Sequence, residues 1–198
     1  MIVVRDEELA QQALAEGSLR CPHRGCGDSV YRDGYARRRM VRTRAGGERE
    51  LRPQRVACRR CGRTNVLLPA WCVPGRCDDA ETIGSALLAA AQGQGHRPIA
   101  AKLGRPATTV RGWLRAARGH IETLRAQAYT LQGRVESPSE ERLGPAGSGL
   151  ADAVAALAAA AAAATRFLGA DRYRTTPWAY IVLITGGRLL RPRPRATG

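Results

Sequence analysis

The chain has 198 residues, 44% of them hydrophobic and only 5% aromatic, which predicts small cores built mainly from Leu, Val, Ile and Ala. This apolar content excludes a chain that is disordered throughout. The 32 Lys and Arg residues outnumber the 17 Asp and Glu residues, and the formal net charge of +15 favours a polyanionic partner, either nucleic acid or an anionic membrane surface.

The first residues of the chain, Met1 to Glu8, lack the apolar segment of a signal peptide, so we expect a cytoplasmic, nucleoid-associated protein. Residues 1–19 are predicted to form a short amphipathic helix that ends at Gly17. In the reducing cytoplasm, closely spaced cysteines are more often metal ligands than disulfides. The spacing of the six cysteines is therefore informative.

Residues 20–69 form the most basic segment, with fourteen Arg, four acidic residues and a net charge of +10. Apolar residues alternate with Arg in its middle, and the Gly46-Gly47 pair predicts a hairpin turn. We expect the hairpin arginines to contact a phosphate backbone. These candidate DNA-binding residues are Arg37, Arg38, Arg39 and Arg42, with Arg44 beside them.

Two cysteine pairs flank this hairpin, Cys21 with Cys26 and Cys58 with Cys61. Each pair is followed by a glycine that can adopt positive φ and let backbone N–H groups point at the ligand sulfurs. Four thiolates form a closed tetrahedral set for structural Zn²⁺, with no open position for catalysis. The segment is therefore predicted to be a zinc ribbon that folds largely through its metal. His23 could replace a cysteine as ligand, but its place between Cys21 and Cys26 favours a side chain that faces solvent or a phosphate.

The third cysteine pair, Cys72 and Cys77, repeats the wider spacing of the first. A second metal site or ligand exchange with the ribbon would need further ligands, and the sequence places none nearby. A structural or incidental role for these two thiols is the favoured interpretation.

Residues 78–130 are predicted to be helical, beginning with Asp78 and Glu81 as an N-cap pair. Within them, Gly104 suits a sharp turn between two helices and Pro106 suits the start of the second, as in a helix-turn-helix. The predicted trihelical core combines an apolar stripe on the second helix with residues of the two helices before it. These core residues are Val110, Trp113, Leu114, Ala117, Ile99, Leu103, Leu87 and Leu88.

The opposite face of the second helix carries the side chains that we expect in a major groove, with Arg111 or Arg115 suited to a bidentate guanine contact. The candidate DNA-binding residues of this helix are Thr108, Arg111, Arg115 and Arg118. An ordinary helix pair with an exposed basic face is the alternative. Against it, the stretch from His96 to Ile121 holds six basic residues and no acid.

The composition changes again after residue 130. Residues 131–149 are rich in Gly, Ser and Pro and are predicted to be a linker. Residues 150–190 form an Ala-rich helical region, expected to mediate dimerisation or docking to a recombinase, and residues 191–198 form a basic tail. Asp152 and the weak hydrophobicity of Ala argue against a transmembrane helix, so no membrane partner is expected.

The predicted fold class is thus α+β: a small β zinc ribbon, a trihelical helix-turn-helix domain and a helical C-terminal region. This combination resembles the N-terminal DNA-binding part of insertion-sequence transposases, and particularly a group of small actinobacterial zinc-ribbon and helix-turn-helix proteins. The resemblance covers about residues 18–125. It rests on Cys21-Pro22, Cys26-Gly27, the run from Cys58 to Thr64, Leu68-Pro69 and the stretch from Gly95 to Leu114.

The resemblance implies recognition of transposon ends or an operator, with strand transfer by a DDE catalytic domain of RNase H fold. Only 68 residues follow residue 130, too few for such a domain, so no enzymatic activity is expected. The predicted function is non-catalytic, sequence-specific binding of double-stranded DNA, in transposition or in transcriptional regulation.

Two alternatives remain open at this point. One is a truncated or split transposase subunit whose DDE domain is encoded separately. The other is a membrane-associated or redox-responsive regulator that uses Cys72, Cys77 and the C-terminal apolar stretch.

Overall fold

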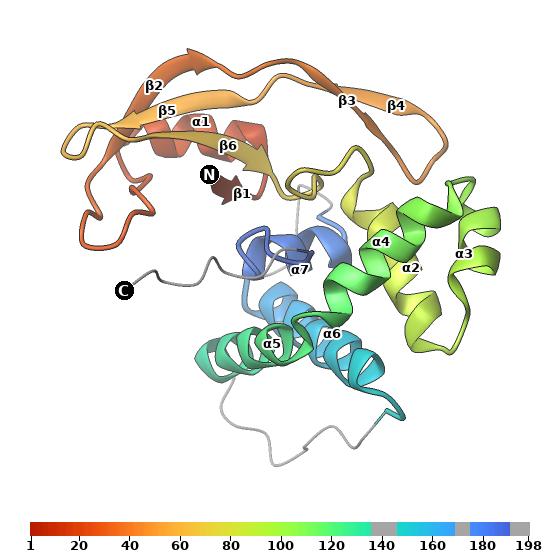
Figure 1. The fold of residues 1–198 in the computed structure, drawn as a ribbon. Coiled ribbons are helices and arrows are strands. Elements are labelled where there is room, and N and C mark those ends of the chain that lie inside the picture. Colours follow the sequence, from red (N-terminus) through yellow and green to blue (C-terminus); the bar gives the residue numbers. More distant parts are fainter. Residues whose placement is uncertain (136–145, 169–174, 191–198) are drawn as a thin grey trace.

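The protein has an α+β architecture, as the sequence predicts, in which strands occupy the N-terminal part and helices the remainder (Figure 1). The structure, a computed structural model, describes residues 1–135, 146–168 and 175–190. The strands form a long arch over the helices, and the second of the two sheets extends the arch toward α3 and α4 (Figure 1).

The larger sheet has four strands in the order β1-β6-β5-β2. The strands β2, β5 and β6 are antiparallel, as expected of a ribbon, whereas β1 runs parallel to β6. The bounds are Ile2–Val4 for β1, Val30–Tyr35 for β2, Gln54–Cys58 for β5 and Thr64–Pro69 for β6.

The smaller sheet is the hairpin of β3 (Arg39–Arg42) and β4 (Glu48–Leu51), in which Arg39 pairs with Leu51 and Arg42 with Glu48. Its turn is the predicted one, since the amide of Thr43 donates to the Gly47 carbonyl at 2.8 Å and Gly46 has φ of 92°.

The prediction of one helix over residues 1–19 is wrong in part. Helix α1 spans only Glu7–Ala15. Its N-cap is Asp6, whose side chain accepts a hydrogen bond from the Leu9 amide. The residues before it form β1 because they pair with the edge of β6. That edge belongs to a segment more than sixty residues away in the sequence. A local helical pattern does not contain that information.

In the described part of the chain, six helices follow the sheets and share one hydrophobic core. Their bounds are Ala80–Ala91 for α2, His96–Leu103 for α3, Ala107–Arg118 for α4, Ile121–Val135 for α5, Gly149–Leu168 for α6 and Pro177–Ile184 for α7. Residues 131–135 of the predicted linker therefore belong to α5. The central part of that linker, residues 136–145, and the predicted basic tail lie outside the described residues.

The predicted apolar stripe of α4 is confirmed, because Val110, Trp113, Leu114 and Ala117 are all buried in this core. On the preceding helix only one of the two predicted leucines packs inward: Leu87 is buried, whereas Leu88 is 44% exposed. Adjacent residues of a helix point about 100° apart, so both can be buried only where neighbours cover a wide arc of the helix.

Helix α6 is an interior helix of this core. Its stretch from Gly149 to Phe167 is long and apolar enough to cross a membrane, but 56% of that window is buried inside the molecule. Helices α5, α7 and α2 pack against it. This burial is typical of the core helix of a soluble protein.

A close contact between α2 and α7 explains a glycine in the interior of α2. A Cβ atom added to Gly84 would overlap the indole ring of Trp178. Gly84 therefore allows the two helices to approach, which offsets its low helix propensity.

We predict that Gly84→Ala lowers the free energy of unfolding by about 1–3 kcal/mol, because the Trp178 ring has to move in a packed core. Urea unfolding followed by circular dichroism measures this change. Gly112→Ala in α4 is the matched control, since its Cβ would meet nothing within 4 Å. The control is expected to be neutral or more stable, by up to about 1 kcal/mol. Equal stability of the two variants would contradict the packing argument.

Candidate metal centre and basic surfaces

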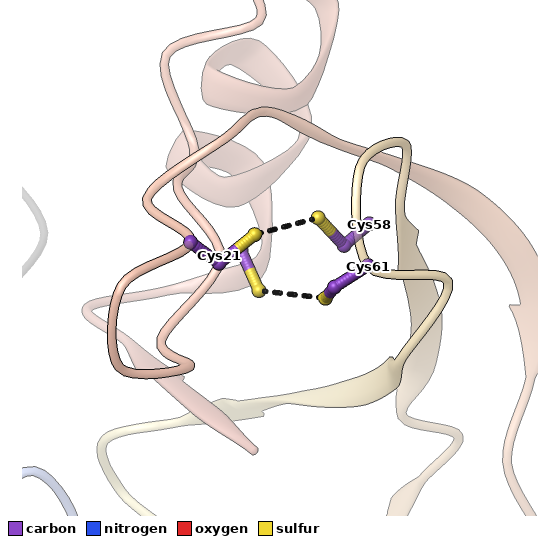
Figure 2. A group of neighbouring side chains, drawn as sticks. Cys21, Cys58 and Cys61 are labelled. Atoms are coloured by element: carbon purple, nitrogen blue, oxygen red, sulfur yellow. Dashed lines mark hydrogen bonds between the residues drawn. The ribbon is translucent and has the colours of Figure 1, made fainter.

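The four predicted ligand cysteines come together at one end of the larger sheet. Cys21 and Cys26 lie in the loop before β2, Cys58 ends β5 and Cys61 lies in the tight turn that leads to β6. Each cysteine pair with its turn forms a knuckle, and Figure 2 shows the side chains of the two knuckles pointing toward one another across a small gap. The sulfur atoms all lie within 4.8 Å of one another.

The sulfur separations fit a tetrahedral metal ion. The Sγ atoms of Cys21 and Cys61 are 3.7 Å apart, and those of Cys26 and Cys58 are 3.4 Å apart. Four sulfurs about 2.3 Å from a central Zn²⁺ would be separated by about 3.8 Å. A disulfide would need about 2.05 Å, and all four cysteines are free. The cluster can therefore hold a metal ion without large rearrangement.

Backbone N–H groups near the cluster stabilise negative charge on a sulfur atom. Gly27 and Gly62, which follow the two knuckles, have φ of 58° and 66° as predicted. The amide of Cys61 donates to the Cys58 sulfur and, with further hydrogen bonds from Cys26 and the Arg60 amide, lowers the pKa of Cys58 to about 7 despite burial. One thiolate is thus favoured even before a metal ion binds.

The pKa values of Cys21 and Cys26 are raised in the metal-free cluster. The amide of His23 donates to Cys21, but burial and the three neighbouring cysteines outweigh it and raise the pKa of Cys21 to about 12. Although the Asp28 amide donates to Cys26, contact with Cys58 raises the pKa of Cys26 as well. Four crowded thiols cannot all ionise without a cation between them. A metal ion would supply that cation and displace the protons.

The His23 side chain and the third cysteine pair do not belong to the four-sulfur cluster. The Nδ1 atom of His23 lies 3.1 Å from a guanidinium nitrogen of Arg63, so this imidazole faces a cation rather than the sulfurs. Cys72 is buried beside Val41, Leu51 and Leu68, and burial raises its pKa to about 12. Cys77 is exposed and free. Cys72 thus has a packing role.

The candidate DNA-binding residues of α4 share one exposed face. Thr108, Arg111, Arg115 and Arg118 are all exposed, on the side of the helix opposite the buried stripe. Within the described part of the chain, none of the three arginines forms an ion pair. Helix α4 therefore presents an unneutralised basic surface that runs from Arg111 to Arg118, about 10 Å at 1.5 Å per residue.

The connection between α3 and α4 gives this surface its orientation. Gly104 ends α3 with φ of 61°, in the left-handed region that favours glycine, and its amide donates to the Ala101 carbonyl. Pro106 then precedes the first residue of α4, as the sequence predicts. The two helices cross with Ile99, Ala100 and Val110 buried between them.

The candidate arginines of the hairpin segment have different surroundings. Arg37 and Arg38 are exposed, Arg38 lying 3.2 Å from Glu50, and Arg39 is half-buried. Arg42 instead donates to the buried carboxylate of Asp78 at 2.8 Å. Arg42 therefore has a structural contact that the sequence analysis did not foresee.

Asp78 is the centre of a clamp that joins the hairpin to the helices. Its side chain, 2% exposed, accepts from Arg42 of β3 and from Nε of Arg105 in the α3–α4 turn. Arg105 also contacts the Thr43 carbonyl, and the Arg42 amide donates to the Cys77 carbonyl at 2.7 Å. These residues hold the hairpin, the start of α2 and the α3–α4 turn together.

This arrangement corrects the predicted cap of α2. The N-cap is Asp79, whose Oδ1 accepts from the Thr82 amide at 2.8 Å and whose Oδ2 accepts from the Arg44 amide. Asp78 lies one residue earlier and is free to bind the two arginines. Two adjacent acids in a basic stretch were the only sequence signal of the clamp, and they did not identify its partners.

Comparison of the chain with known proteins finds no matching protein family, no similar curated protein and no similar solved structure.

We predict that Asp78→Ala destabilises the protein by about 3 kcal/mol, because it leaves the guanidinium of Arg105, only 13% exposed, without its carboxylate. Urea unfolding measures the change. Glu50→Ala is the control, since Glu50 and Arg38 are each more than half exposed, and the loss expected there is below about 1 kcal/mol. Similar losses in both variants would show that the clamp contributes no more than a surface pair.

Proposed function

We propose that the chain is a non-catalytic protein that binds double-stranded DNA sequence-specifically and uses structural Zn²⁺ in its ribbon. The observation that carries the proposal is the exposed face of α4, where three unpaired arginines lie opposite a fully buried stripe. A helix of this kind can enter the major groove while its other face anchors it to the protein.

The arrangement of α2, α3 and α4 supports a helix-turn-helix interpretation. Helix α4 follows α3 through a short turn at Gly104, and α2 packs against both helices. In proteins with this motif, the second helix reads base edges and the first crosses the phosphate backbone. The exposed basic residues of α3, Arg97 and Lys102, suit such backbone contacts.

Within α4, position along the helix divides the proposed roles. Thr108 in the first turn suits a base edge or a phosphate, and Arg111 one turn later suits bidentate contact with guanine. Arg115 is a second candidate for base contact. Arg118 in the last turn suits a phosphate, because the end of such a helix lies nearer the groove edge.

Zn²⁺ is the metal that best suits the four-cysteine cluster. Soft thiolate ligands in a closed tetrahedral set are typical of structural zinc. The ligands would be Cys21, Cys26, Cys58 and Cys61, and the ion would join the loop before β2 to the end of β5. Its contribution is to folding of the ribbon and not to a reaction.

The direct test is selection of bound duplexes from a random pool by zinc-loaded protein at about 0.15 M salt, where non-specific electrostatic binding is weakened. We predict an enriched motif. Enrichment in inverted repeats would indicate a role in transposition, and enrichment in a promoter would indicate regulation. Binding without enrichment, lost steeply as salt rises, would overturn sequence-specific recognition.

We predict that Arg111→Ala weakens binding to the selected site by roughly 1–3 kcal/mol and relaxes preference at one base pair. Binding to a panel of single-base variants of the site measures both effects. Lys102→Ala on α3 is the charge-matched control, and it is expected to weaken binding equally on every sequence. A uniform effect of Arg111→Ala would contradict base readout.

We predict that Cys58→Ser lowers the bound zinc from one ion per chain to a small fraction and unfolds the ribbon, because three ligands hold zinc far less tightly. Metal analysis and amide exchange of β2 and β5 measure these effects. Cys77→Ser is the matched control, since Cys77 is exposed and outside the cluster. Full zinc content in Cys58→Ser would disprove the four-cysteine assignment.

A further inference from the structure

A second basic feature lies away from α4, at the bend between the two sheets. The segment from Tyr35 to Arg39 connects β2 to β3, and it faces β6 and the loop around Gly75 across a hollow of about 800 Å³. Four arginines line this hollow: Arg37, Arg38, Arg39 and Arg55. Its lining contains no Asp or Glu among the residues that the structure describes.

The charge of this hollow is only partly neutralised. Arg55 lies 2.7 Å from Asp33, and Arg38 lies 3.2 Å from Glu50, but both ion pairs are exposed and therefore weak. Over the described ranges, Arg37 and Arg39 form no ion pair. The exposed guanidinium group of Arg37 can therefore bind an anion without losing another partner.

The rest of the lining is mixed, because it includes the polar residues Thr64 and Asn65 as well as an apolar area. Met40, Pro53, Val66, Leu68 and Pro74 contribute to it beside the arginines. A simple patch for a phosphate backbone needs no apolar surface. An apolar area next to several guanidinium groups suits a ligand with an anionic end and a flat, less polar body.

We propose that this hollow binds a nucleotide, with its phosphate held by Arg37 and Arg39 and its base and sugar against the apolar lining. The volume lies within the range of about 300–1,000 Å³ that is usual for small-molecule sites. Arg guanidinium groups bind phosphate oxygens in a bidentate manner, which gives the phosphate the strongest contacts. The nucleotide is either free or the unpaired end of a nucleic-acid strand, because both present the same chemical groups.

This site is independent of the proposed reading of duplex DNA by α4. Its residues belong to the strands and to the loop before α2, whereas Thr108, Arg111 and Arg115 belong to α4. A variant can therefore lose nucleotide binding and keep duplex binding, or the reverse.

The test is isothermal titration of the zinc-loaded full chain at about 0.15 M salt with AMP, with adenosine and with a 5′-phosphorylated six-nucleotide single strand. We expect saturable binding of AMP, of the strand or of both, and much weaker binding of adenosine. Binding of AMP identifies free nucleotide as sufficient, and binding of the strand alone assigns the site to a strand end.

Arg37→Gln/Arg39→Gln is expected to weaken that binding by at least roughly tenfold, because two charge-assisted contacts are lost. Arg37→Gln alone, at an exposed position, keeps the test valid if the double variant folds poorly. Arg32→Gln/Arg134→Gln, at two exposed positions outside the hollow and outside α3 and α4, is the control that removes the same charge elsewhere, and it should bind as the wild type does.

Three results would overturn the proposal: no binding of AMP or of the strand, equal binding of AMP and adenosine, or equal weakening by the pocket and control variants. The last would mean that only the overall charge attracts the probes. Duplex binding of the same variants, measured in parallel, distinguishes failure of this site from failure of the proposed DNA interface.

Discussion

The buried carboxylate of Asp78 is the contact on which the relation between the strands and the helices depends. A carboxylate that is 2% exposed needs cationic partners, and it takes one from each side, Arg42 from β3 and Arg105 from the α3–α4 turn. The backbone bonds around it then align the hairpin with the start of α2. The basic hairpin and the basic helix α4 are thereby held in one relative position. A pre-arranged pair of surfaces loses less entropy on binding than two that move independently.

The strands depend on a different constraint from the helices. The core of the larger sheet contains few buried residues, and two of them, Cys21 and Cys58, belong to the sulfur cluster. The helical core is several times larger and contains none of the cysteines of the cluster. Since a small domain cannot bury enough apolar surface to offset its conformational entropy, a metal ion at the cluster is the natural source of the missing stability. The hairpin is instead held by the clamp at Asp78, which joins it to the helices.

The features that the sequence predicted correctly are local ones. A cysteine spacing together with its glycine defines a knuckle, and the pattern from Val110 to Ala117 defines the buried side of α4, because both depend on neighbours a few residues away. The features that it missed are non-local. The pairing of β1 with β6, the exposure of Leu88 and the partners of Asp78 are each decided by segments distant in the sequence. Composition and periodicity contain no information about such partners.

The contacts of the arginines are likewise decided by segments distant in the sequence, and they divide the arginines into structural and solvent-facing ones. Nearly all of the basic residues of the chain are Arg, so the formal charge of +15 cannot distinguish structural from available guanidinium groups. The structure separates them by their surroundings: Arg42 and Arg105 contact a buried acid, whereas Arg111 and Arg115 face solvent without an acidic neighbour. An arginine that already binds a buried carboxylate has little to gain from a phosphate, because it would leave that carboxylate unpaired. The capacity for anions therefore belongs to exposed arginines that have no acidic partner, and those of α4 and Arg37 at the bend between the sheets are among them.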